Sequence, residues 1–299
     1  MKTRDSNLEL LRIVSMLMII MLHYFSMGLG LENVTSYDKN YLMFAALYSL
    51  SVVGVNCFVL TTGYYSINSV SIKTRKILNL IIQVAFWGIV LYIISFLYNG
   101  GSLEVKEIVK KAVPYFFDLR WFVRTYIILL FFIPFINRLL KGLSRKSFLM
   151  LIMIYVVIFS VWYSFLPGSP TLDNGYGIIN FILLYMVGSY IRMNRVHINK
   201  WICLLCYLVS VVCIIISSYT FLQSRCWGYS YIFVITGSIA LFLFFENLNI
   251  GSLRLVNFMA KYAFGVYLIH SDMHFADILW RDNIKCGMEQ HYLYRRLLE

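Results

Sequence analysis

Charged side chains are scarce in this chain. Asp, Glu, Lys and Arg together make up 13% of its 299 residues, whereas a soluble domain usually has about 25%. Hydrophobic residues reach 60%, and they recur in long runs along the sequence. This composition excludes an ordinary soluble domain and predicts an all-α, polytopic integral membrane protein whose first partner is the lipid bilayer.

The six cysteines do not form the pattern of a disulfide framework or of a zinc site. Cys203, Cys206 and Cys213 share one hydrophobic run, where cysteine behaves as a small apolar residue. Because the Cys203/Cys206 pair has no matching second pair, we expect no metal ion and no bound cofactor. The net charge of +12 would indicate nucleic acid for a soluble protein. Here most basic residues lie in short loops between apolar runs, and we expect no nucleic-acid partner.

Nine apolar runs predict about nine transmembrane helices. These runs cover residues 8–29, 43–65, 77–98, 122–140, 148–166, 176–191, 201–222, 230–245 and 255–272. No stretch between them is long enough for a second domain, so we predict a single domain over residues 1–299. The first run has no small-residue cleavage site, and we expect it to remain as a full span.

The positions of the basic residues predict a multi-pass protein of the cytoplasmic membrane with a cytoplasmic N-terminus. In that orientation most Lys and Arg residues before residue 273 lie inside, and the outer side carries only Lys39, Lys106, Lys110, Lys111, Arg120, Arg124 and Arg225. Within the longest connection, LEVKEIVKKAVPYFF predicts an amphipathic helix at the surface. Residues 273–299 are charged and would lie outside, against this bias. Either one of the weaker spans is misassigned or the chain is truncated just before a last helix, and we favour truncation.

The first run places a cation and an imidazole on one face of a membrane helix. Arg12 and His23 are eleven positions apart, which corresponds to about 16 Å along a helix and three turns plus about 20°. Arg12 would lie near the inner interface, and His23 about half a membrane deeper. An ionisable residue at that depth is a functional candidate, although a histidine hydrogen-bonded between packed helices explains its position equally well. Ser6 and Glu9 predict a capping box, and Glu9 is placed to pair with Arg12.

This pair suits group transfer from an anionic carrier. The Arg12 guanidinium can bind an anionic ligand through two hydrogen bonds, or it can lie against lipid phosphate. A neutral His23 deeper on the same face can accept a proton from a hydroxyl nucleophile.

A second polar feature extends from residue 54 to residue 76. GVNCFVLTTGYYS carries Asn56, Thr61 and Thr62 in an otherwise apolar span, and such residues commonly pack membrane helices together. It is followed by three cations, which would attract anionic lipid or the phosphates of a nucleotide-like donor. They are Lys73, Arg75 and Lys76.

Two further stretches carry polar residues near the ends of apolar runs. In DLRWFVRTYIILLFFIPFIN, Trp121 and Tyr126 suit an interfacial aromatic belt, whereas Arg124 lies inside the start of a span, where a charge is costly. In KYAFGVYLIHSD, His270 and Asp272 form either a polar pair or the solvated end of a helix.

Together the four stretches resemble the membrane-bound type-3 acyltransferase family, which includes O-acetyltransferases of bacterial surface polysaccharides. The first span is similar to the family's opening motif, an arginine and a histidine separated by ten residues. GVNCFVLTTGYY resembles its second-span pattern, with Thr62 where serine is usual. RWFVRTYIILLFFIPFIN is similar to its Trp-Phe…Tyr…Leu…Pro…Asn helix, with Arg124 where a small or polar residue is usual. YAFGVYLIH resembles the segment before the last helix, with Phe264 in the first aromatic position. The family has ten spans, so the resemblance implies that the tenth is missing.

The resemblance implies transfer of an acyl group, most often acetyl, from cytoplasmic acyl-CoA to a hydroxyl of a cell-surface polysaccharide or lipid-linked sugar. His23 would be the catalytic histidine, acting as a base or carrying the acyl group itself, and Arg12 its donor-side partner. Lys73, Arg75 and Lys76 would bind the donor, acetyl-CoA in the commonest case. The candidates to line the acceptor site or a channel are Asn56, Thr62, Tyr64, Trp121, Arg124 and His270.

Two other functions are compatible with a polytopic membrane protein. A transporter would have broken helices at the midplane and an internal repeat, and the halves of this sequence show no clear repeat. An inactive, truncated remnant of the acyltransferase is favoured by the missing last span.

Overall fold

The computed structural model describes residues 6–28, 40–99, 104–114, 120–171, 173–272, 275 and 278–280. Within these residues, six apolar helices are long enough to cross a membrane: Asn7–Ser26, Tyr41–Ser66, Thr74–Asn99, Trp121–Lys141, Arg145–Phe165 and Lys200–Ser218. Ile178–Asn194 and Ile232–Glu246 are shorter apolar helices. The described residues contain no strand. The prediction of an all-α polytopic membrane protein is confirmed.

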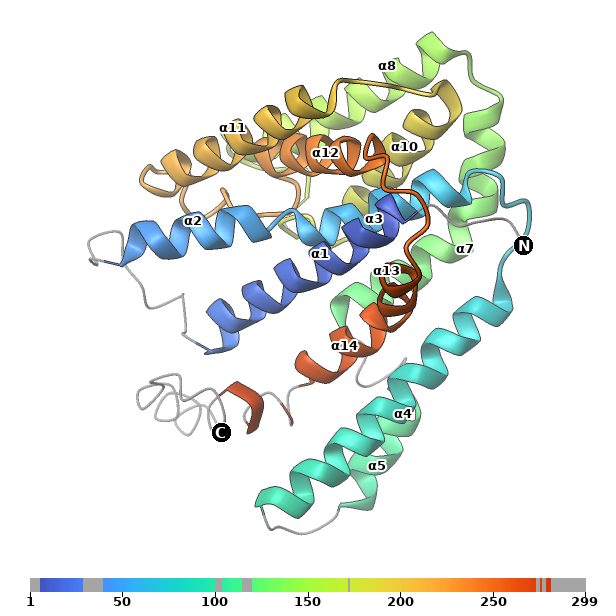
Figure 1. Ribbon diagram of the computed structural model, residues 1–299, viewed down its shortest axis with the longest axis vertical. Helices are drawn as coiled ribbons and strands as arrows, with labels where there is room; N and C mark the ends of the chain where they lie inside the picture. The colour runs from blue at the N-terminus through green and yellow to red at the C-terminus, as the bar shows by residue number, and fades with distance from the viewer. Residues whose placement is uncertain are drawn as a thin grey trace.

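The helices form one bundle with an arm at its side (Figure 1). The first half of the chain forms α1 (Asn7–His23), the π-helical turn η1 (Tyr24–Gly28), α2 (Tyr41–Ser51), α3 (Gly54–Ser66), α4 (Thr74–Asn99), α5 (Val105–Ala112) and α7 (Trp121–Lys141). The second half forms α8 (Arg145–Val156), η3 (Val157–Val161), α9 (Trp162–Phe165), α10 (Ile178–Asn194), α11 (Lys200–Ser218), α12 (Ile232–Glu246), α13 (Arg254–Met259), η4 (Ala260–Tyr262) and α14 (Ala263–His270).

Helix α3 lies at the centre of the bundle, in contact with α1, α10 and α12. A Cβ atom on Gly63 would overlap the carbonyl oxygen of Tyr185 in α10, and one on Gly188 in α10 would overlap the carbonyl oxygen of Leu60 in α3. Gly54 makes a similar approach to α1, since its Cβ would lie 2.9 Å from the carbonyl oxygen of Ser15. Small residues commonly permit such close packing of membrane helices. These glycines fix how the α3 side chains meet the neighbouring helices.

The arm consists of α4 and α5 (Figure 1). Helix α5 packs along α4, where the side chain of Lys111 covers Gly88. A helix is present over Val105–Ala112 of the predicted amphipathic stretch, but it packs along the apolar helix α4, and its location at the membrane surface stays a prediction. Residues 103 and 115–117 of that stretch lie outside the described residues. Helix α4 also contacts α14, so the arm joins the bundle beside the last helices.

The ninth predicted span, 255–272, is broken into three short segments, α13, η4 and α14. The predicted capping box at Ser6 is wrong, because Ser6 has helical backbone angles (φ −86°, ψ −7°) and its side chain does not cap α1. Instead its hydroxyl accepts a hydrogen bond from the Leu253 amide (2.7 Å) and donates to Asn257 Oδ1 (3.0 Å). The start of α1 is therefore tied to α13.

The helix ends gather on two sides of the bundle. Asn7 Nδ2 donates to the Glu246 carbonyl (2.8 Å), which brings the start of α1 to the end of α12. Arg192 donates to the Tyr64 hydroxyl (3.0 Å), which brings the end of α10 to the end of α3. We name this side of the bundle the Asn7 side. We name the opposite side, where Tyr176 precedes α10, the Tyr176 side. Lys2, Arg4, Lys39 and most of the charged segment 273–299 lie outside the described residues.

Candidate active site

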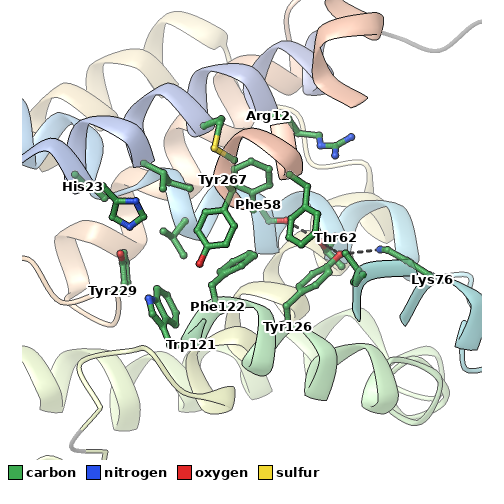
Figure 2. Close-up of a pocket in the computed structure, with 16 residues that line it drawn as sticks. Arg12, His23, Phe58, Thr62, Lys76, Trp121, Phe122, Tyr126, Tyr229 and Tyr267 are labelled. Atoms are coloured by element: carbon green, nitrogen blue, oxygen red, sulfur yellow. Dashed lines mark hydrogen bonds between the residues drawn. The ribbon is translucent and has the colours of Figure 1, made fainter. Parts of the chain in front are cut away.

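A cavity of about 160 Å³ lies between α1, α3, α7 and α14, and residues at the start of α4 line one end of it. Figure 2 shows Arg12 and Lys76 at that end and His23 at the other. The walls between them are mostly apolar and aromatic, with Phe58, Phe122 and Tyr267 in the middle. The cavity therefore connects a cationic mouth to an imidazole through a largely apolar passage.

Arg12 and His23 both line this cavity, so the prediction that they share one face of α1 is confirmed. The predicted pair of Glu9 and Arg12 is also present, with Arg12 Nη1 3.0 Å from Glu9 Oε2. Glu9 is 1% exposed and the Arg12 side chain is 27% exposed. The carboxylate thus anchors the guanidinium from inside the bundle, where a charge is stable only when it is paired.

A hydrogen-bond network holds Lys76 opposite Arg12. Lys76 Nζ donates to the Tyr126 hydroxyl (2.9 Å), which lies 3.2 Å from the hydroxyl of Thr62. The Thr62 hydroxyl also donates to the Phe58 carbonyl in its own helix (3.0 Å). Phe122 stacks on Tyr126 with ring centroids 5.7 Å apart and planes 8° apart. From the sequence, Tyr126 was expected in an interfacial belt and matched the tyrosine of the family's Trp-Phe…Tyr helix, but its bond to Lys76 was not predicted.

The cations extend from the cavity to the surface of the Asn7 side. A second hollow, of about 370 Å³, shares Arg12, Thr62 and Lys76 with the cavity and adds Lys73. Beside it, an open groove at the start of α4 is lined by Lys73, Arg75 and Lys76. Lys76 lines all three of these hollows, so the four predicted cations lie near one another on the Asn7 side, and such a cluster attracts anions. We name Arg12, Lys73, Arg75 and Lys76 the cationic mouth.

Asn137 positions the loop that leads into this mouth. Its side-chain amide donates to the carbonyl oxygens of Ser66 (2.7 Å) and Ser69 (2.9 Å), directly after α3. Its Oδ1 accepts a hydrogen bond from the Tyr185 hydroxyl (2.6 Å). Asn137 thus links α7 to α10 and to the loop before Lys73. The sequence did not predict this role, because the bonds join segments far apart in the chain.

The opposite end of the cavity is lined by His23, Trp121 and Tyr229 (Figure 2). Trp121 stacks on Tyr229, with centroids 5.4 Å apart, and meets the edge of Tyr176 at 4.4 Å. Asn56 is not in the cavity wall, and its amide donates to the Tyr229 carbonyl (3.0 Å). Burial raises the pKa of Tyr229 well above its usual value, so its phenol stays neutral. Tyr229 lies in a loop, where no helical periodicity could have predicted it.

His270 lies behind His23 and does not line the cavity. Its ring centroid is 4.9 Å from that of His23, and only 4% of the residue is exposed. The predicted pair of His270 and Asp272 is not formed, because Asp272 instead accepts a hydrogen bond from Arg120 at 2.9 Å. Lys111 Nζ is 3.9 Å from the same carboxylate.

The family described as an acyltransferase domain matches residues 5–282, nearly the whole chain. The chain belongs to the type-3 acyltransferase family. It is therefore a multi-pass membrane acyltransferase, as the four motifs predicted. No curated protein and no solved structure matches the chain.

Two predicted site residues of this acyltransferase lie away from the cavity. The Tyr64 hydroxyl donates to Glu246 Oε1 (3.0 Å), and Arg192 lies over the Tyr64 ring. Arg124 is exposed and does not line the cavity. Each residue is two positions from a cavity-lining residue, Thr62 or Phe122, and two steps of about 100° turn a side chain to the other face of a helix.

The cavity gives this acyltransferase the parts that acyl transfer needs. The cationic mouth can hold phosphates, and the apolar passage can receive a slender acyl-bearing chain while limiting the access of water. The imidazole at its far end can move a proton. Among the described residues, no three His, Cys, Asp or Glu side chains are grouped to hold a metal ion.

Proposed function

We propose that this acyltransferase moves an acyl group, in the simplest case acetyl, from acyl-CoA to a hydroxyl of a cell-surface polysaccharide or lipid-linked sugar. The observation that carries the proposal is the cavity with Arg12 and Lys76 at one end and His23 at the other. An ordinary packing histidine would not need such a passage, nor two cations at its other end.

In this proposal the donor enters from the Asn7 side. Arg12, Lys73, Arg75 and Lys76 bind the phosphates of acyl-CoA, and the thioester arm extends along α1 towards His23. Eleven helical residues span about 16 Å, a distance that suits an extended thioester chain better than a compact ligand. The excess of basic residues on the Asn7 side supports a cytoplasmic location for that side.

His23 acts in this proposal as a general base. It accepts the proton of the acceptor hydroxyl while the hydroxyl oxygen attacks the thioester carbonyl carbon. A C–O bond forms, the C–S bond breaks, and the departing thiolate takes the proton from His23. The products are an ester on the acceptor and free CoA thiol, and His23 returns to its starting form.

The test is to express the full chain with and without His23→Ala and to measure O-acetyl ester on surface glycan by proton NMR. Removal of a general base typically lowers the rate by about 10²–10⁴-fold, so we expect the ester signal to be lost. His197→Ala is the matched control, because His197 is an exposed histidine outside the cavity. Unchanged ester content in His23→Ala cells would refute the catalytic assignment.

A further inference from the structure

Two buried ring nitrogens beside the cavity make no hydrogen bond to any described residue. They are Nδ1 of His23 and Nε2 of His270. The two rings lie 4.9 Å apart between centroids and are tilted by 44°. A buried polar atom without a partner is costly and uncommon. The described structure forms no bond between them, but because the two rings are adjacent, each of these atoms is a candidate partner for the other.

The role of His270 Nε2 is set by the other nitrogen of the same ring. Nδ1 lies 2.6 Å from the carbonyl oxygen of Val266, one helical turn earlier. A carbonyl oxygen only accepts hydrogen bonds, so Nδ1 must carry the proton. In the neutral ring Nε2 then has a lone pair and can only accept. The partner that His270 requires is therefore a donor.

The end of α14 is held firmly enough to keep His270 in this position. Arg120 donates to the Leu268 carbonyl (3.0 Å) and to the Asp272 carboxylate (2.9 Å), which lie on either side of His270 in the sequence. Tyr267 flanks both imidazoles, with its ring centroid 6.3 Å from that of His23 and 6.0 Å from that of His270.

We propose that His270 is a positioning residue that accepts a hydrogen bond from Nδ1–H of His23 through its own Nε2. This inference rests on the proposed function, in which His23 is the base. The bond gives both buried nitrogens a partner and selects one tautomer of His23. In that tautomer the lone pair is on Nε2 of His23, where it is available to take a proton from the acceptor hydroxyl.

The choice of an imidazole for this role fits the surroundings. In serine hydrolases a carboxylate orients the catalytic histidine, but a carboxylate next to His23 would place a charge in a largely apolar site. A neutral imidazole that donates its own proton to a backbone carbonyl supplies an acceptor without that charge. His270 thus orients His23 and does not itself contact the reacting atoms.

The kinetic test uses membrane vesicles that carry the full chain and the host's own glycan, with radiolabelled acetyl-CoA as the donor. His270→Phe keeps a ring of similar size and removes the acceptor. We expect its maximal rate to fall about 10–100-fold, the usual loss when an orienting partner is removed, with an unchanged KM for acetyl-CoA. His270→Gln, which places an acceptor oxygen near the position of Nε2, should recover most of that rate.

Ser271→Ala is the matched control for a disturbed helix end. Ser271 is buried next to His270, and its hydroxyl donates to the Tyr267 carbonyl (2.6 Å) in the same helix. We expect nearly unchanged kinetics, because this hydroxyl is bonded within its own helix. A full rate in His270→Phe, or a rate that falls equally in His270→Phe, His270→Gln and Ser271→Ala, would overturn the positioning role.

A second measurement needs no turnover. Nitrogen-15 NMR of histidine-labelled protein in nanodiscs reports which ring nitrogen carries the proton, and His23→Ala and His270→Phe assign the two signals among the five histidines. We expect a single His23 tautomer with the proton on Nδ1, which is lost in His270→Phe. A proton on Nε2 of His23, or a tautomer unaffected by His270→Phe, would overturn the inference. The predicted tautomer together with full activity of His23→Ala would instead refute only the proposed function.

Discussion

The two ends of the cavity are built from different kinds of side chain. At the mouth, Arg12 and Lys76 are charged, partly exposed and held by Glu9 and Tyr126. At the far end, His23 lies among aromatic rings and next to a second imidazole. Charge suits recognition of a soluble anion, whereas an imidazole set among aromatic rings suits chemistry on a hydroxyl. In the proposed function, binding and proton transfer are therefore separated along α1.

Removal of charge at the mouth should have the largest effect on this separation. Arg12→Gln should raise the KM for acetyl-CoA about 10–100-fold, because hydrogen bonds to charged groups contribute about 1.5–3 kcal/mol and about 1.4 kcal/mol corresponds to tenfold. The maximal rate should change little. Initial rates over a range of acetyl-CoA concentrations measure both quantities.

Two controls sharpen this result. S-acetylpantetheine lacks all the phosphates of the CoA thioester, so Arg12→Gln and the unchanged protein should use it equally well. Arg138→Gln removes an exposed basic residue that lies near the same end of the bundle and outside the cavity, and its KM should be normal. A fall in the maximal rate of Arg12→Gln without a change in KM would contradict the separation.

A substitution in the contact between α3 and α10 should lower the stability of the whole bundle. Gly63→Ala would force α3 away from the Tyr185 carbonyl, and such overpacking typically costs about 1–3 kcal/mol of stability. We expect a lower midpoint of thermal unfolding in detergent. Gly265→Ala is the control, since its Cβ would meet nothing nearer than Trp87 Nε1 at 3.9 Å. Equal midpoints for the two variants would show that the contact between α3 and α10 has room for a methyl group at Gly63.

The smallest effect is expected at Arg124. Its side chain is exposed and does not line the cavity, so Arg124→Gln should leave both KM and the maximal rate within the error of the transfer assay. A clear loss of activity would show that the cavity extends further along α7 than its lining residues indicate.

Helical periodicity predicted the parts of this molecule that depend on one helix. The apolar runs located the spans, and the eleven-residue spacing placed Arg12 and His23 on one face, because both follow from the fixed geometry of an α-helix. The pairing of Glu9 with Arg12 followed from the same geometry. Lys73, Arg75 and Lys76 lie within four positions of the sequence, so they would be close together in any fold.

Contacts between distant segments could not be predicted in this way. Tyr229 reaches the cavity from a loop, and Asn56 helps to place it through a backbone carbonyl. Ser6 bonds to Leu253 and Asn257 instead of capping its own helix. Each of these contacts depends on how helices pack against each other, which the local pattern of residues does not record.

The most direct test of the central claim is an experimental structure of the full chain in nanodiscs with a non-hydrolysable thioether analogue of acetyl-CoA. We expect the phosphates to lie against Arg12, Lys73 or Lys76 and the acyl end to lie beside the His23 ring, with the connecting chain in the cavity. Phosphates bound near Trp121 and Tyr229, or an acyl end that lies outside the cavity, would contradict the account.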